Sequence, residues 1–166
     1  MSSRWVVNAS PVILLSKVGH LHLLGELVDE LILPTGVAQE VQAKPDGQLA
    51  VESLLASPSV RTASCGPIPT DVEVWDLGRG ESEVLAWALT SDGCRVVIDD
   101  LEARRCAQAL GIPVIGTLGV VLRAKRKGLI AAARPIVDEL RRVGMYVAGD
   151  LIERALAHLG ESPGGS

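Results

Sequence analysis

Short apolar runs alternate with longer segments of helical periodicity along most of the chain. Runs of three or four residues, bounded by polar or turn-forming residues, predict buried strands. These runs are Trp5–Val7, Leu31–Leu33, Val60–Ala63, Arg95–Ile98 and Pro113–Ile115. Short strands of mainly apolar residues that alternate with helices are typical of a parallel sheet covered on both faces, so the pattern predicts an α/β protein.

Segments with apolar residues at helical spacing separate these runs and predict helices. They are Pro11–Leu15, Leu21–Leu27, Gly36–Ala43, Gln48–Ala56, Gly80–Thr90, Leu101–Leu110, Thr117–Lys127, Ala132–Val143 and Leu151–Leu159. Ser10 is predicted to cap the first helix. In the segment Gln48–Ala56, Leu49, Leu54 and Leu55 are expected to form the apolar, buried face of the helix. The segment Ser64–Arg79, which is rich in Pro and Gly, is expected to be a loop.

A length of 166 residues agrees with a single domain. We expect this domain to cover residues 1–159 and residues 160–166 to form a disordered tail. The sequence contains neither a secretory leader nor an apolar stretch of the roughly 18 residues that a membrane helix needs, so no membrane contact is predicted. Its three cysteines form no CxxC pair, which favours reduced thiols and a cytoplasmic location.

Aromatic residues are scarce, with three Trp, one Tyr and no Phe, although 48% of the residues are hydrophobic. Proteins that hold single-stranded nucleic acid by base stacking use several aromatic platforms, and this chain cannot supply a set of them. Charge is unevenly spread: residues 1–100 carry 6 Lys/Arg and 14 Asp/Glu, whereas residues 101–166 carry 10 and 6. This asymmetry indicates either an acidic site beside a basic surface or chance scatter.

Polar side chains follow the predicted strands at points that a parallel sheet brings together. Asn8 ends the first strand, Asp99 and Asp100 end the fourth, and Glu40 and Glu81 lie on predicted helices. In open α/β sheets, ligands bind outside the carboxyl ends of the strands. Grouped carboxylates repel one another unless a cation neutralises them, and oxygen ligands suit Mg²⁺ or Mn²⁺. The sequence therefore predicts a metal site able to support phosphodiester hydrolysis.

The same segments resemble the ordered motifs of PIN-domain nucleases, over about residues 5–157. The matching segments are Val6–Ile13, Val37–Val41, Gly78–Glu83, Val96–Asp100 with Ala103–Arg104, and Gly111–Gly119. The resemblance implies a three-layer α/β/α sandwich with a central parallel sheet. It also implies cleavage of RNA with Mg²⁺ or Mn²⁺, usually by a homodimer. The last segment resembles a branch related to toxins of toxin–antitoxin pairs, which implies a cognate antitoxin as a partner.

The resemblance also assigns residues to the site. The implied metal ligands are Asn8, Glu40, Glu81, Asp99 and Asp100, and the implied catalytic residues are Glu40, Glu81 and Asp99. Either Asp99 or Asp100 takes the fourth acidic position. Asn8 stands where these nucleases usually carry Asp, and an amide oxygen can bind a metal but brings no charge. The candidates for substrate binding are Ser10, Thr117, Arg123, Lys125 and Arg126.

Structural explanations compete with each of these assignments. Asp99 or Asp100 would also serve as a helix cap, and Glu81 lies in a first helical turn where acids are favoured in any case. The basic cluster around Arg123 fits a solvated helix end as well as it fits a phosphate contact. Because of Asn8, the alternative function is a non-catalytic PIN-like module that binds RNA or protein. A phosphoacceptor signalling domain is disfavoured, since it needs acids where Asn8 stands.

Overall fold

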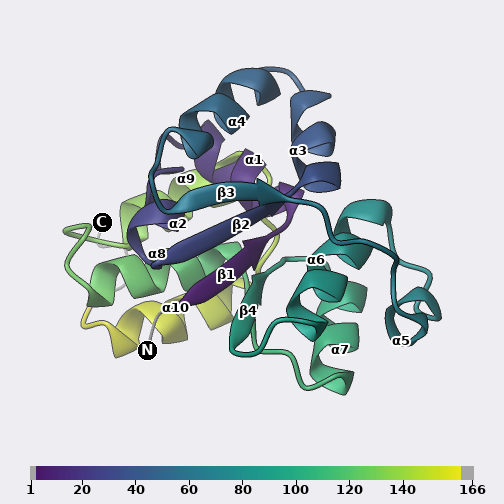
Figure 1. Ribbon diagram of the computed structural model, residues 1–166. Coiled ribbons are helices and arrows are strands. Elements are labelled where there is room, and N and C mark those ends of the chain that lie inside the picture. Colours follow the sequence, from purple (N-terminus) through teal and green to yellow (C-terminus); the bar gives the residue numbers. More distant parts are fainter. Residues whose placement is uncertain (1–2, 162–166) are drawn as a thin grey trace.

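The computed structural model describes residues 3–161, which contain a parallel five-stranded sheet (Figure 1). Its strands are β1 (Arg4–Val7), β2 (Glu30–Pro34), β3 (Val60–Ala63), β4 (Cys94–Val97) and β5 (Val114–Ile115). Their order in the sheet is β3-β2-β1-β4-β5, and each neighbouring pair runs in parallel. The predicted α/β class with a parallel sheet is therefore confirmed.

The first strand occupies the centre of the sheet. Strands β2 and β3 follow on one side of it, and β4 and β5 follow on the other. Val6 pairs with Ile32 of β2 on one side and with Val96 of β4 on the other. The backbone N–H of Asn8 donates to the carbonyl of Val97 at 3.0 Å, which extends the ladder past the end of β1. The connections after β1 and after β4 therefore lead to opposite edges of the sheet, which makes the boundary between β1 and β4 its switch point. A crevice forms at the carboxyl ends of the strands at such a point.

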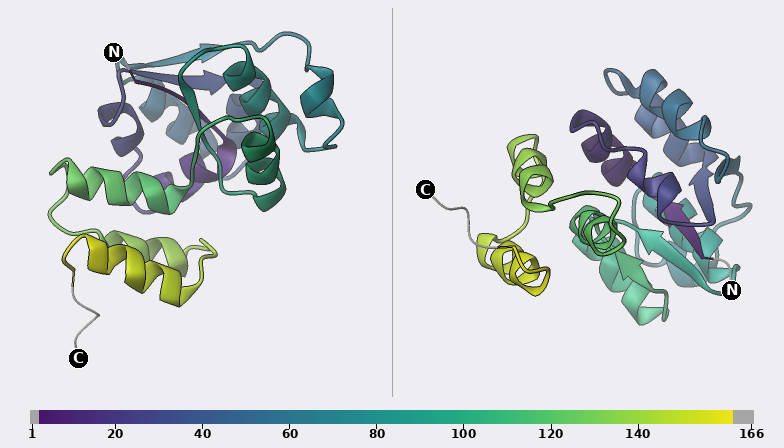
Figure 2. Two further views of the ribbon diagram at one scale, coloured as in Figure 1. Left: turned by 90° about the horizontal axis from the view of Figure 1, so that it is seen from below. Right: turned by 90° about the vertical axis from the view of Figure 1, so that its left-hand side faces the viewer.

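Helices cover both faces of this sheet. They are α1 (Ala9–Lys17), α2 (Leu23–Glu26), α3 (Thr35–Gln42), α4 (Gly47–Leu55), α5 (Thr70–Glu73), α6 (Arg79–Leu89), α7 (Leu101–Ala109), α8 (Thr117–Arg126), α9 (Arg134–Arg142) and α10 (Gly149–His158). Figure 2 shows α1 and α8 on one side of the sheet and α6 with α7 on the other. The expected three-layer sandwich is therefore present.

The last two helices form an outer layer against α8 (Figure 2). Ile136, Val137 and Leu140 of α9 are buried, as are Ile152 and Leu156 of α10. Burying an aliphatic side chain of this size contributes roughly 1.5–3 kcal/mol, so these five residues hold the pair of helices firmly in place. The connection between α9 and α10 then reaches the carboxyl end of the sheet, where it helps to line a cavity described below.

The core is aliphatic, as the composition requires. Val6, Ile32, Val96 and Ile98 are fully buried between the helical layers. The first two strands are apolar on both faces over their inner residues, which is the pattern of a sheet covered on both sides, whereas the inner residues of the edge strand β3 are polar and exposed.

Two sequence predictions about helices are wrong in detail. Helix α1 begins at Ala9, so its N-cap is Asn8 and not Ser10. In α4 the side chain of Leu54 is buried, but Leu49 is 66% exposed and Leu55 is also exposed. The prediction chose the leucines of this segment as the buried face, whereas the helix buries mainly smaller residues. The buried residues of α4 are Gly47, Ala50, Val51 and Leu54, which follow helical spacing, so Leu49 and Leu55 fall outside the buried face.

The segment predicted as a loop, Ser64–Arg79, contains the short helix α5. Pro69 is its N-cap residue and Val72 is its buried anchor, so a single apolar contact supports one helical turn inside the irregular stretch. Within residues 3–161, every helix is too short or too polar to cross a bilayer. The predicted tail falls mostly on residues 162–166, which lie outside the described residues.

Candidate active site

Asn8 lies at the switch point of the sheet, directly after β1, and is 3% exposed. Its Nδ2 donates to Oε1 of Glu81 at 3.5 Å, which is a long hydrogen bond. Its Oδ1 is buried and has no hydrogen-bond partner among residues 3–161. A buried polar oxygen without a partner costs about 1–3 kcal/mol of folding free energy. A hydrogen-bond donor or a cation bound to this atom would remove that cost.

Gly80, in the first turn of α6, brings two oxygen atoms to one point. A Cβ atom on this residue would lie 2.6 Å from Oε2 of Glu40 and 3.3 Å from Oδ1 of Asn8. Both atoms only accept hydrogen bonds, so they cannot satisfy each other. Two acceptor oxygens that face the same small space form a suitable pair of ligands for a hard cation. Glycine at this position keeps the space open.

A second glycine holds α3 against α6. The carboxylate of Glu83 lies directly over Gly36, in the first turn of α3, where any larger residue would collide with it. Arg79 pairs with the outer oxygen of Glu83 at 3.4 Å. The two helices that carry Glu40 and Glu81 therefore meet at two glycines, which fixes the separation of the two carboxylates.

Glu81 lies close enough to Glu40 to affect the ionisation of the Glu40 carboxyl. Partial burial of the Glu40 carboxylate, and next the charge of Glu81, raise the pKa of Glu40, while Lys44 partly offsets them. The residue as a whole is exposed, but its Oε2 atom faces inward over Gly80, so its stem and its charged end have different environments. A divalent cation would reverse this repulsion, because both carboxylates would then gain from being ionised.

This raised pKa predicts a pH-dependent effect of Glu40→Gln on stability. A glutamate whose pKa is higher in the folded state than in the unfolded chain begins to destabilise the fold as the pH rises above the unfolded value, and does so fully above the folded pKa. Without metal, the variant should therefore unfold at a higher temperature than the wild type at pH 7. The difference should vanish below the ordinary glutamate value of 4.5. Thermal unfolding of both proteins across this pH range measures it.

Glu73→Gln is the matched control, because Glu73 is an exposed acid on α5. It should leave the unfolding temperature unchanged relative to the wild type at every pH. An equal gain in the two variants would trace the effect to net charge and not to the Glu40–Glu81 contact.

Asp99 lies across the crevice, after β4, and is held by three hydrogen bonds. The backbone N–H of Thr117 donates to Oδ1 at 2.8 Å, and the Thr117 hydroxyl donates to Oδ2 at 2.7 Å. The hydroxyl of Ser10 also donates to Oδ2, at 3.2 Å. Thr117 is fully buried at the start of α8, so it forms a rigid support. Ser10 and Thr117 therefore orient this carboxylate, and Ser10 also lines the cavity described below.

Asp100 has a different local role from Asp99. Its Oδ2 accepts a hydrogen bond from the backbone N–H of Ala103 at 2.9 Å, which makes Asp100 the N-cap of α7. The residue is exposed, whereas Asp99 is half-buried. Of the two neighbouring acids, Asp99 is thus fixed toward the interior of the crevice, and Asp100 completes a helix end.

The site is only partly closed around a metal position. Within residues 3–161, no three Asp, Glu, His or Cys side chains are close enough together to enclose a metal ion. Asn8, Glu40 and Glu81 gather on one side, and Asp99 is turned toward Thr117 on the other. The donor set nevertheless consists of carboxylate and amide oxygens, the ligands that Mg²⁺ and Mn²⁺ prefer.

A cavity of 920 Å³ opens from this crevice. Asn8, Glu81, Asp99 and Asp100 form its acidic end. Residues of α7 and of the α9–α10 region continue the wall, namely Leu101, Arg104, Arg105, Gln108, Tyr146, Val147 and Leu151. The lining of the cavity therefore combines carboxylates, guanidinium groups and apolar side chains, which suits a long anionic ligand with apolar parts.

Sequence analysis missed three of these residues. A Cβ atom on Gly116 would lie 2.8 Å from Nη1 of Arg104 and 3.0 Å from Oδ1 of Asp99, so this guanidinium lies near the acidic end. Arg105 follows it on α7, and Tyr146, which is fully exposed, belongs to the α9–α10 connection. The position of Arg104 on the helix that follows Asp99 could have indicated its place. The position of Tyr146 depends on how the outer helices pack.

The basic cluster on α8 does not reach this cavity. Arg123 lines a different cavity, at the opposite end of the sheet. Nζ of Lys125 donates to the carbonyl of Ala131, just beyond the end of α8, and Arg126 is exposed. The structure therefore brings Asn8, Glu40, Glu81 and Asp99 to one crevice and leaves these three cations outside it.

A parallel α/β sheet with acidic side chains at its switch point is the arrangement that the resemblance to PIN-domain nucleases implied. Comparison with protein families agrees, because a family model described as a PIN domain matches residues 4–161. The chain belongs to the PIN-domain family. PIN domains are generally nucleases that act on RNA with divalent metal ions. A search of curated proteins finds no match to the chain.

Proposed function

We propose that the chain is a ribonuclease that requires Mg²⁺ or Mn²⁺. The observation that carries this proposal is the pair of inward-facing oxygens, Oδ1 of Asn8 and Oε2 of Glu40, beside the carboxylate of Glu81. Their chemistry fits a hard divalent ion, and the buried Oδ1 atom has no hydrogen-bond partner in residues 3–161. The nuclease activity typical of the family agrees with such a site.

Each residue of the crevice has a distinct task in this proposal. Asn8, Glu40 and Glu81 would hold the ion from one side, and Asp99 would face it from the other. The bound ion would supply an activated water and would neutralise charge on the phosphate. Ser10 and Thr117 are positioning residues, because they fix the carboxylate of Asp99 through three hydrogen bonds.

The RNA strand would lie along the cavity that leaves the crevice. Arg104 and Arg105 line it next to the acidic end, and guanidinium groups bind phosphate oxygens in pairs. Such local cations are needed because the whole chain carries a net charge of −4, which repels a polyanion. Phosphates held by Arg104 and Arg105 would place the next phosphodiester over Asp99 and Glu81.

Tyr146→Ala should weaken RNA binding by about 5- to 150-fold, the range expected for the loss of one base–aromatic stack. Tyr146 is fully exposed at the rim of the cavity, so its ring face is free to stack on an unpaired base. Tyr146→Phe keeps the ring and should bind like the wild type. Fluorescence anisotropy with a labelled RNA in the presence of EDTA measures binding without cleavage. With an oligonucleotide that lacks the stacked base, Tyr146→Ala should bind no more weakly than the wild type. Equal binding of the intact RNA by Tyr146→Ala and Tyr146→Phe would contradict the stacking contact.

The direct test of the proposed function is cleavage of RNA by the purified chain with added Mn²⁺ or Mg²⁺. Glu81→Gln is the control variant, because it removes one carboxylate and keeps the size of the side chain. Cleavage should require the metal, should stop with EDTA and should be lost in the variant. Intact RNA after incubation with folded wild-type protein and metal would refute the proposal.

We further propose that the chain is the toxin of a toxin–antitoxin pair and acts as a homodimer. The sequence resemblance at Gly111–Gly119 supports the first part. Exposed apolar side chains at the cavity, Leu101 and Leu151, support a protein partner there. Expression of the wild type should then arrest cell growth, and Asp99→Asn should not. Light scattering of the purified chain gives its oligomeric state.

A non-catalytic binding module is the second candidate function, and Asn8 is the observation that favours it. An amide in place of a carboxylate weakens the attraction for a cation. In that case RNA would bind equally well with metal and with chelator, and no RNA would be cleaved under either condition.

A further inference from the structure

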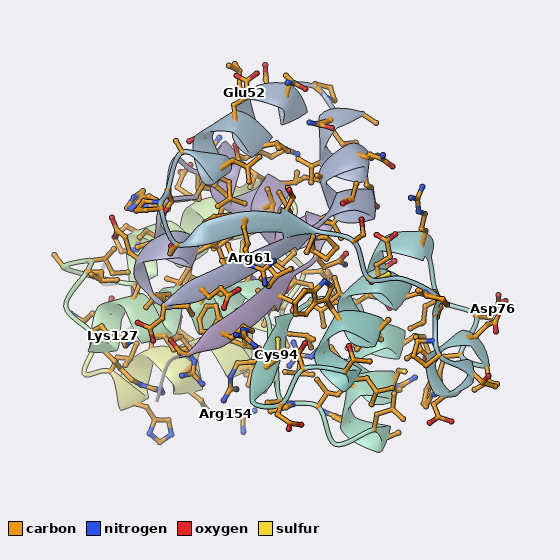
Figure 3. The ribbon with its side chains drawn as sticks, viewed as in Figure 1. Glu52, Arg61, Asp76, Cys94, Lys127 and Arg154 are labelled. Carbon is orange, nitrogen blue, oxygen red and sulfur yellow. The ribbon has the colours of Figure 1, made fainter. Side chains whose placement is uncertain are left out.

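A second cavity, of 220 Å³, lies at the amino ends of β1 and β4. It is at the opposite end of the sheet from Asn8 and Asp99. In Figure 3, Lys127 marks this end of the strands, while Asp76 lies beyond their carboxyl ends. The side chains that line it with Lys127 include Trp5, Arg95 and Arg123. We call this cavity the amino-end pocket.

Two separate elements, β4 and α8, bring three cations to the amino-end pocket. Arg95 of β4 pairs in register with Trp5 of β1, so both side chains lie on the same face of the sheet. Arg123 of α8 and Lys127, its C-cap residue, are four positions apart and therefore share one face of the helix. The cluster of cations that the sequence shows near residue 123 is thus divided, and two of its members face Arg95 across the pocket.

These cations have little compensation from nearby acids. Within residues 3–161, neither Arg95 nor Arg123 nor Lys127 has an acidic side chain within ion-pair distance. Lys127 donates to the carbonyl of Leu27 at 3.2 Å. The charge of Lys127 is felt by Asp29, but that carboxylate already accepts hydrogen bonds from the backbone N–H and the hydroxyl of Ser3.

The remaining cation of the pocket, Arg4, does not change this balance. It binds Glu30 at 2.8 Å, and Glu30 also binds Arg61 at 2.7 Å, so one acid is shared by two cations. Burial, and next the charges of Arg95 and Arg126, lower the pKa of Arg123. Crowding of like charges in a protein with a net charge of −4 is a local cost that an anionic ligand would remove.

We propose that the amino-end pocket binds a phosphate group. The guanidinium groups of Arg95 and Arg123 offer forked pairs of donors that match phosphate oxygens, and Lys127 adds a point charge. A volume of 220 Å³ accommodates a phosphate and the group that carries it, but not an extended peptide. This site is separate from the proposed metal crevice, and it binds its ligand whether or not the crevice cleaves RNA.

Phosphate binding is tested by calorimetric titration of the full chain at low salt, with EDTA present. Inorganic phosphate is the first probe, and a short oligoribonucleotide with and without a 5′-phosphate is the second. Arg95→Gln and Arg123→Gln should each weaken binding of inorganic phosphate by about tenfold or more, as the loss of a charge-assisted hydrogen bond predicts. Two separate variants keep the test valid if one of them fails to fold.

The matched control is Arg142→Gln, which removes one exposed cation from α9, where Arg142 pairs with Glu139. It should leave phosphate binding within about twofold of the wild type, because it removes a distant cation that is already paired with an acid and makes no contact with the amino-end pocket. Preference for the 5′-phosphorylated oligonucleotide over inorganic phosphate would identify an RNA end as the source, and equal binding would identify the free anion.

Three results would overturn the proposal. The first is the absence of saturable phosphate binding by the wild type. The second is an equal loss in Arg142→Gln, which would reduce the effect to overall charge. The third is binding of an acidic peptide such as oligoglutamate without binding of phosphate, which would make the pocket a protein-docking site. Because EDTA prevents metal-dependent cleavage in all arms, these results are independent of whether the chain is a nuclease.

Discussion

Asn8→Asp should tighten Mn²⁺ binding by at least about tenfold and should raise the rate of metal-dependent RNA cleavage. Asn8 is 3% exposed, and its oxygen shares one small space with Oε2 of Glu40. A full negative charge about 4 Å from a divalent ion is worth several kcal/mol at the effective dielectric of a protein surface, and part of this is lost to desolvation. Calorimetric titration with Mn²⁺ measures the affinity.

The same substitution should have opposite effects on stability without and with metal. Without metal, the new carboxylate is buried beside Glu81, and the hydrogen bond from Nδ2 of Asn8 is gone, so the unfolding temperature should fall. With saturating Mn²⁺ the variant should gain more stability than the wild type gains, because tighter binding to the folded state stabilises it further. An unchanged metal affinity would show that Asn8 lies outside the metal site.

Asp99→Asn should abolish most of the cleavage activity, by about 100-fold or more, which is the usual cost of removing a preorganised charged group from an active site. The amide keeps the shape of the carboxylate but loses its charge. It also cannot accept all three of the hydrogen bonds that Ser10 and Thr117 now donate to the two oxygens.

Asp100→Asn is the matched control for this loss. Asparagine caps helices as well as aspartate does, so α7 should remain intact and the variant should cleave RNA nearly as fast as the wild type. Single-turnover cleavage with saturating metal compares the three proteins, and thermal unfolding confirms that each is folded. A large loss in Asp100→Asn with full activity in Asp99→Asn would exchange the proposed roles of these neighbouring acids.

The fold follows from the sequence because each buried strand is a short apolar run. All five strands lie where such runs occur, and the parallel arrangement follows from their alternation with helices. What the pattern could not give is the packing of small residues. Leu49 has the apolar character of a core residue but is exposed, because Gly47, Ala50, Val51 and Leu54 form the buried face of α4.

The grouping of the site followed from one rule about parallel sheets. Asn8, Glu81 and Asp99 are far apart in the sequence, yet all three line one cavity at the carboxyl ends of the strands. The choice between Asp99 and Asp100 needed hydrogen-bond geometry, since neighbouring residues of one type have the same pattern. Tyr146 could not be found from the sequence because only the packing of α9 and α10 brings it to the cavity.

The sheet also separates charges of opposite sign along its strands. Glu40, Glu81 and Asp99 lie at the carboxyl ends, and Arg95 and Arg123 lie at the amino ends. These side chains form a local negative pole at the carboxyl ends and a local positive pole at the amino ends, and an approaching polyanion favours orientations of the protein that turn the positive pole toward it. A divalent ion bound between Asn8 and Glu40 would weaken the negative pole, so loading of the ion would also set how readily that pole can face RNA.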